Sequence, residues 1–142
     1  MKFIRALFER QKSDVTSAIE LAHTRGFTQD VVGEASYQKA LTKITGGKRD
    51  RSAKHYCAAL LICETGNRYD KNAVAVKIDN RLVGYLPKDV ALGYRSELAQ
   101  LASSLPNAVV RAKIVGGWKQ HDSEGHFGVK LNLKRPLVFK SE

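Results

Sequence analysis

The chain has 142 residues, of which 43% are hydrophobic, and 24 Lys and Arg against 14 Asp and Glu give a formal net charge of +10. This length suits one domain with its own core, and the hydrophobic content excludes a disordered chain. A charge this positive favours a polyanionic partner, nucleic acid before a membrane surface, although a basic surface that binds nothing would carry the same charge.

Several classes of protein are excluded. No apolar run reaches the roughly 18 residues that a membrane span needs, and charges interrupt the N-terminus too often for a secretion signal, so we expect a cytoplasmic protein with no membrane contact. Cys57 and Cys63 lie in one β-type run, roughly 20 Å apart along a strand, too far for a disulfide within it. Without a Cys-x-x-Cys pair we expect no zinc, no other metal and no cofactor.

The first part of the chain is predicted to be helical. Apolar residues recur at helical spacing through 1–26, which we interpret as an N-terminal extension of two short helices, the second ending at Gly26. A strand over 27–33 and a short helix over 34–45 follow. The basic, turn-rich segment 48–54 is predicted to be a mobile loop.

The rest of the chain is mainly of β type. Five further strands are predicted, at 55–65, 73–78, 81–86, 108–115 and 127–133. A helix over 88–105, with one apolar stripe, interrupts them. Six strands and a late helix predict a mostly β fold of the α+β class, a small OB-like six-stranded β-barrel with an inserted helix, because closure removes exposed sheet edges. This barrel domain is expected to span 27–142.

The segment 64–73 carries more chemistry than a turn needs. Its centre is the run Asn67, Arg68, Tyr69, Asp70, Lys71 and Asn72. A simple reversal uses Gly, Asn or Asp alone, whereas this run adds a ring, two cations and a carboxylate, which predicts a loop that holds a ligand. The structural alternative is that Asp70 bonds the backbone two residues on, or pairs with Lys71 or Arg68.

Three motifs resemble a known family. They are Val31-Val-Gly-Glu34 followed by Tyr37, Asn67-Arg-Tyr-Asp-Lys-Asn-Ala-Val74, and Val83-Gly-Tyr-Leu-Pro-Lys88. From about 31 to 133 the chain is similar to the HIRAN domain, which occurs as a stand-alone bacterial protein and in SNF2-type translocases such as helicase-like transcription factor. The resemblance implies an OB-like barrel that captures single-stranded DNA at a free 3′-hydroxyl, in DNA repair or replication-fork processing.

The resemblance also implies roles for the loop residues. Asn67, Tyr69 and Asp70 would form a pocket for the terminal nucleotide. Asp70 would accept a hydrogen bond from the 3′-hydroxyl, and Tyr69 would lie against the sugar or base. Arg68 and Lys71, beside them, would attract the phosphates.

Four further site residues come from other segments. Tyr85 stands where the studied domain has a histidine, Lys88 where it has a phosphate-contacting lysine, and Phe127 where it has an aromatic residue beside a base. The family has an arginine and two adjacent aromatic residues after the first strand's glycine, of which this chain keeps one ring, Tyr37. Stacking of a base would therefore depend on Tyr37.

The residues also favour strand binding without the resemblance, because bases stack on exposed rings while cations follow the backbone. No Ser or Cys has a base at motif spacing and no phosphate-cradling loop is present, so we do not expect an enzyme. The expected function is a non-catalytic module that binds single-stranded DNA at 3′ ends and works with a helicase, nuclease or translocase. The alternatives are a protein-interaction adaptor that uses the N-terminal helices, and a metal-dependent nuclease, which the surrounding cations disfavour.

Overall fold

The computed structural model describes residues 18–141, so the helix predicted at the start of the chain lies outside the described residues. The strands are β1 (Ile19–Glu20), β2 (Gln29–Asp30), β3 (Ala53–Cys63), β4 (Val74–Ile78), β5 (Arg81–Tyr85), β6 (Ala108–Gly116), β7 (Lys119–Gln120), β8 (Ser123–Glu124) and β9 (Phe127–Asn132). The helical elements are the 3-10 turn η1 (Glu34–Tyr37), α3 (Gln38–Thr45) and α4 (Lys88–Ala102). Among the described residues, no helix is both long and apolar enough to cross a membrane.

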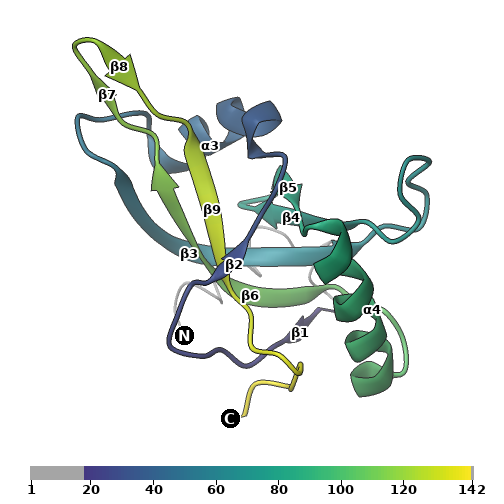
Figure 1. Ribbon diagram of the computed structural model, residues 1–142. Coiled ribbons are helices and arrows are strands. Elements are labelled where there is room, and N and C mark those ends of the chain that lie inside the picture. Colours follow the sequence, from purple (N-terminus) through teal and green to yellow (C-terminus); the bar gives the residue numbers. More distant parts are fainter. Residues whose placement is uncertain (1–17, 142) are drawn as a thin grey trace.

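One curled sheet forms the body of the molecule (Figure 1). Six strands follow the order β2-β9-β6-β3-β4-β5, all antiparallel to their neighbours, and β1 pairs with β6 in parallel as a seventh strand. The predicted α+β class and small OB-like fold with a late inserted helix are confirmed. The curled sheet has one strand more than the six predicted, because β1 falls in a segment predicted to be helical, and the hairpin of β7 and β8 adds two strands outside this sheet.

The two outer strands of the path approach each other at an isolated bridge. Val32 N–H donates to Tyr85 O at 2.8 Å, and Tyr85 N–H donates back to Val32 O at 2.9 Å. Gly84 permits this approach, because a Cβ atom there would lie 2.6 Å from the carbonyl oxygen of Val32 and 2.5 Å from the side chain of Val31. These two backbone hydrogen bonds therefore join the segment after β2 to the end of β5 at the open side of the half-barrel.

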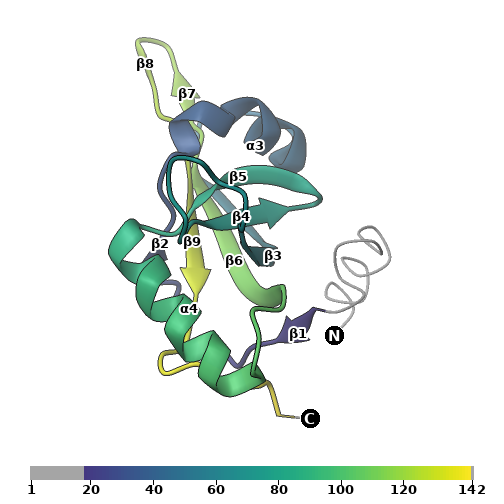
Figure 2. The same cartoon turned by 90° about the vertical axis from the view of Figure 1, so that its right-hand side faces the viewer.

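The core fills the inside of the curl. Alternation along β9 predicts one buried face, and its inward residues are at most 8% exposed: Phe127, Val129, Leu131 and Leu133. The helix α4 adds Ala91, Tyr94 and Leu98 to the same core and lies below and to the left of β4 and β5 in Figure 2. It ends at Ala102, three residues before the predicted end.

The helix prediction is wrong for the residues just before Gly26. Ile19–Glu20 forms β1 beside β6, and Leu21 forms a bridge with Phe139 near the C-terminus. Ala22 N–H donates to Val138 O at 2.9 Å. Pairing on both sides of this segment, with residues about 90 and 120 positions away, outweighs its local helical spacing.

Two more segments differ from the prediction. The strand predicted over 27–33 is reduced to β2 and the bridge at Val32. The segment 48–54 is hydrogen-bonded to the corner after β6 rather than free: Lys119 N–H donates to Arg49 O at 2.7 Å, and Gly116 N–H donates to Ser52 Oγ at 2.7 Å. The order of the segment 48–54 thus comes from contacts with a part of the chain that is distant in sequence.

Candidate functional site

The loop between β3 and β4 is shaped by its own side chains. Asn67 Oδ1 accepts the N–H groups of Tyr69 at 2.9 Å and Asp70 at 3.0 Å. Asp70 Oδ1 in turn accepts Asn72 N–H at 2.9 Å. This is the structural alternative raised for Asp70, and such side-chain bonds are typical of Asx turns. Two of the predicted site residues therefore fix the loop's conformation, whatever else they bind.

The ends of the loop are tied to each other and to α4. Glu64 N–H donates to Ala73 O at 2.9 Å, closing the base of the loop. Arg95 on α4 donates from one guanidinium nitrogen to both Glu64 O and Ala73 O, each at 3.4 Å. Arg95 is not among the predicted site residues, since nothing in the helical pattern indicates that a cation of α4 reaches this loop.

Behind the loop, side chains from three segments meet. Burial raises the pKa of Tyr85 to about 12, with the Glu64 carboxylate and the Tyr37 hydroxyl, both hydrogen-bonded to it, as further causes. Asn67 Nδ2 donates to Glu64 Oε1 at 3.0 Å, which joins this cluster to the loop. The structure thus brings together the predicted residues Tyr37, Asn67 and Tyr85. It adds Glu64, whose only sequence signal is its place at the start of the motif.

The tip of the loop faces solvent. Tyr69 is 89% exposed, and Arg68 and Lys71 beside it are exposed as well. Within residues 18–141, neither cation forms an ion pair with Asp70. Lys88, the first residue of α4, is also exposed. The Tyr69 ring, the cations of Arg68 and Lys71 and the Asp70 carboxylate are therefore available to a ligand at this loop.

Phe127 does not belong to this surface. It is 2% exposed, and its ring packs so closely on Gly117 that a Cβ atom there would lie 1.9 Å from a ring carbon. Gln38 holds its backbone, accepting Phe127 N–H at 2.8 Å and donating to Phe127 O at 3.0 Å. A ring buried in this way cannot lie beside a base, so the role predicted for Phe127 is corrected to core packing.

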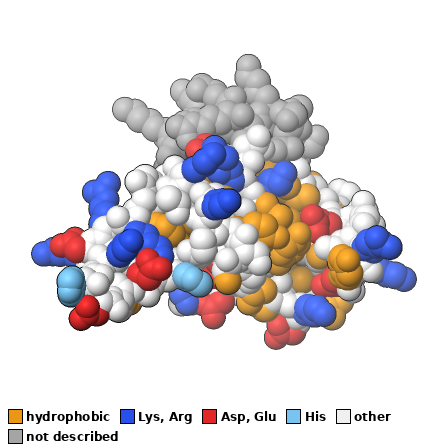
Figure 3. Space-filling view, turned by 90° about the horizontal axis from the view of Figure 1, so that it is seen from above, with side chains coloured by type: hydrophobic (Ala, Val, Ile, Leu, Met, Phe, Trp, Pro, Cys, Tyr) orange, Lys and Arg blue, Asp and Glu red, His pale blue; other side chains and the backbone are white. Residues whose placement is uncertain are grey.

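Positive charge alone does not locate the site. Seen from above, Lys and Arg side chains are spread over the surface in separate groups, several with acidic side chains beside them (Figure 3). Two of the ion pairs in the described part of the chain are Lys48 with Glu124 at 3.4 Å and Lys140 with Glu20 at 3.2 Å. The arrangement of rings and hydrogen bonds around the loop is therefore more informative than the net charge.

Among solved structures, the chain is similar to the crystal structure of the HIRAN domain of human HLTF. The match covers 82% of this chain and 78% of that chain, at 18% sequence identity and a TM-score of 0.33. No protein-family model matches the sequence, and no curated protein does. The matched structure is a HIRAN domain, the family that the sequence motifs resemble. A TM-score this low supports no residue-by-residue transfer, so we derive the function from this chain's own residues.

Proposed function

We propose that this chain binds single-stranded DNA and receives a free 3′ end at the loop 64–73. The observation that carries the proposal is the exposed Tyr69 with Arg68 and Lys71 beside it, two cations that form no ion pair within residues 18–141, on a loop fixed by Asn67 and Asp70. A ring that is 89% exposed offers a stacking face, and base stacking contributes about 1–3 kcal/mol for each base. The sequence resemblance to the HIRAN domain supports the same ligand.

End selection is assigned to Asp70. One of its carboxylate oxygens is engaged by Asn72 N–H, which leaves Oδ2 to accept a hydrogen bond from a terminal hydroxyl. An internal nucleotide or a 3′-phosphate would instead place negative charge against this carboxylate. Two unit charges 4 Å apart in water repel by about 1 kcal/mol, and a phosphomonoester carries a charge of about −1.5 to −2. We therefore expect roughly a tenfold preference for a 3′-hydroxyl.

The test compares oligonucleotides that end in a 3′-hydroxyl or a 3′-phosphate by fluorescence anisotropy. The variant is Asp70→Asn, because the amide oxygen can still accept Asn72 N–H and preserve the turn while the charge is removed. We expect Asp70→Asn to bind the 3′-phosphate oligonucleotide more tightly than the wild type does, so that the preference shrinks. Equal affinity of the wild-type protein for the two oligonucleotides would refute end recognition.

Tyr69→Ala supplies the matched control. Because its ring is 89% exposed, we expect this variant to bind both oligonucleotides more weakly by the same factor and to leave the preference between them unchanged. The adaptor alternative rests on the helices predicted within 1–26. Residues 1–17 of that extension lie outside the described residues, and Ile19–Glu20 forms a strand rather than a helix. In the described part of the chain, no contact favours the adaptor over strand binding.

A further inference from the structure

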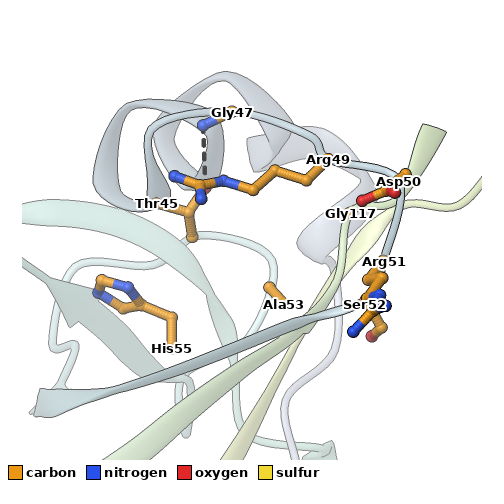
Figure 4. Close-up of a pocket in the computed structure, with 9 residues that line it drawn as sticks. All are labelled: Thr45, Gly47, Arg49, Asp50, Arg51, Ser52, Ala53, His55 and Gly117. Carbon is orange, nitrogen blue, oxygen red and sulfur yellow. Dashed lines mark hydrogen bonds between the residues drawn. The ribbon is translucent and has the colours of Figure 1, made fainter.

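A cavity of about 400 Å³ lies at the other end of β3 from the loop 64–73. Its walls are the end of α3, the segment 47–52 and the start of β3, with Gly117 from the corner after β6. In Figure 4 the Arg49 side chain extends beneath the end of α3 toward Thr45, and His55 lies on the wall that β3 provides. A volume of this size can hold more than a single ion.

The cavity is lined mainly by groups that favour an anion. Arg49 and Arg51 both line it, and in the described part of the chain neither guanidinium forms an ion pair. Ser52 contributes a hydroxyl whose oxygen accepts Gly116 N–H at 2.7 Å, so its proton is free to be donated. Asp50 is the one carboxylate among the lining residues and lies across the cavity from His55 in Figure 4.

The arginines are carried on a backbone that is already ordered by hydrogen bonds. Arg49 N–H donates to Gly117 O at 3.3 Å and Arg49 O accepts Lys119 N–H at 2.7 Å, so both backbone groups of this residue are hydrogen-bonded to the corner after β6. Gln120 Nε2 donates to Asp50 O at 3.1 Å. Because the backbone is fixed before a ligand arrives, binding would order only the side chains, which lowers its entropic cost.

We infer that this cavity binds a phosphate group of the same nucleic-acid strand whose 3′ end lies at the loop 64–73. The inference rests on the proposed function and extends it to a second contact. Paired guanidinium groups suit phosphate because their donors match its oxygens bidentately. The strand β3 connects the two sites over 11 residues, about 36 Å along its length, which is about ten nucleotides at a stacked spacing of 3.4 Å.

The strand length needed to reach both sites provides the test. We compare oligonucleotides of about 4 and about 16 nucleotides, the range of site sizes for OB-type domains, each with a 3′-hydroxyl. The variant is Arg49→Ala with Arg51→Ala, and the control is Arg25→Ala with Lys134→Ala, which removes the same charge from exposed positions outside both sites. Affinity is measured by fluorescence anisotropy at several salt concentrations.

We expect the double arginine variant to bind the long oligonucleotide several-fold more weakly. The slope of log K against log salt should become shallower by about 1.4, at about 0.7 for each phosphate contact with a single strand. The affinity of the double arginine variant for the short oligonucleotide should equal that of the wild type. The control pair of substitutions should lower the affinity for the long oligonucleotide by a smaller factor. An equal loss for short and long strands, or a loss no larger than that of the control, would overturn the inference.

A second measurement separates the sources of phosphate. The His55 ring is followed by NMR while inorganic phosphate, a mononucleotide or the long oligonucleotide is added. A shift with the long oligonucleotide that the double arginine variant abolishes supports the strand contact. A saturable shift with phosphate or mononucleotide alone, and none with the strand, assigns the cavity to a free ligand and overturns the inference. If binding of the long oligonucleotide depends on Arg49 and Arg51 but the wild type shows no preference for a 3′-hydroxyl, end recognition is refuted and the phosphate contact in the cavity is retained.

Discussion

At the scale of single residues, Asn67 and Asp70 both stabilise the conformation of the loop by hydrogen bonds that require no ligand. Asn67 makes three hydrogen bonds within the segment 64–70, and Asp70 caps Asn72 with one oxygen. Alanine at either position would change loop shape and ligand contacts together. This is why Asp70→Asn, which preserves the acceptor and removes the charge, is the more informative substitution.

Cys57 provides a test of the core that is independent of any ligand. Burial raises the pKa of its thiol to about 12 from 9.0, with the Asp79 carboxylate as a further cause. Between pH 9 and pH 12 the unfolded chain therefore loses a proton that the folded chain keeps. The free energy of unfolding should fall as pH rises through this window, by up to about 1.4 kcal/mol for each pH unit from this group.

Cys57→Ala removes this contribution, so its stability should decline less steeply than that of the wild type between pH 9 and pH 12 in urea unfolding. Cys63→Ala is the matched control. Burial also raises the pKa of Cys63, but Arg95 opposes the shift, so the variant should stay closer to the wild-type profile. Identical pH profiles for Cys57→Ala and the wild type would contradict the burial of this thiol.

At the scale of elements, the short strand β2 and the turn η1 are placed by closure of the barrel. The bridge between Val32 and Tyr85 holds the segment that leads into η1, and Tyr37 at the end of η1 then lies close enough to hydrogen-bond Tyr85. The rings of the candidate site are thus assembled by a contact between the first and last strands of the path, not by either strand alone.

Gly84→Ala tests this closure. The new Cβ would meet backbone at 2.6 Å and the Val31 side chain at 2.5 Å, so we expect a loss of about 1–3 kcal/mol in unfolding free energy. The pKa of Tyr85 should also move back toward its ordinary value, because strain at the bridge separates it from Tyr37. Spectrophotometric titration of tyrosine checks the second effect, with Tyr85→Phe to identify the signal.

Gly66→Ala, in the loop 64–73, controls for the loss of a glycine. A Cβ at Gly66 meets nothing within 4 Å, so its stability should stay within about 0.5 kcal/mol of the wild type. Similar behaviour of the two alanine variants would mean that the approach of Val32 to Tyr85 does not limit stability.

At the scale of the whole molecule, the net charge of +10 predicts strand binding that weakens steadily with salt. Lys88 lies at the start of α4, three residues after Tyr85, and is exposed. Lys88→Ala should weaken the binding of all single strands by the same factor and make the slope of log K against log salt shallower by about 0.7. Lys134→Ala removes the same charge and should leave the slope nearly unchanged. A change in 3′-hydroxyl preference in Lys88→Ala would contradict the separate roles given to Lys88 and Asp70.

Much of the fold can be predicted from local patterns. Strict alternation along 127–133 places four side chains on one buried face. Asp79–Asn80 joins the strands predicted at 73–78 and 81–86 in a tight turn, because both residues tolerate positive φ, at 52° and 62°. The stripe along α4 depends on helical spacing alone. The motif residues 67–72 also determine their own loop, since the bonds that shape it join positions two or three apart.

Other features depend on residues distant in sequence, which no local pattern reveals. The segment 19–22 has helical spacing, yet it lies extended because β6 and the C-terminal segment pair with it. Phe127 has the alternation of a core residue and the motif position of a site residue, and packing on Gly117 places it in the core. Arg95 and Glu64 join the site, and Arg49 and Arg51 line a cavity, because curling of the sheet brings separate segments together. Residue types and spacing thus account for the strands and the loop, whereas closure of the barrel selects which side chains share a surface.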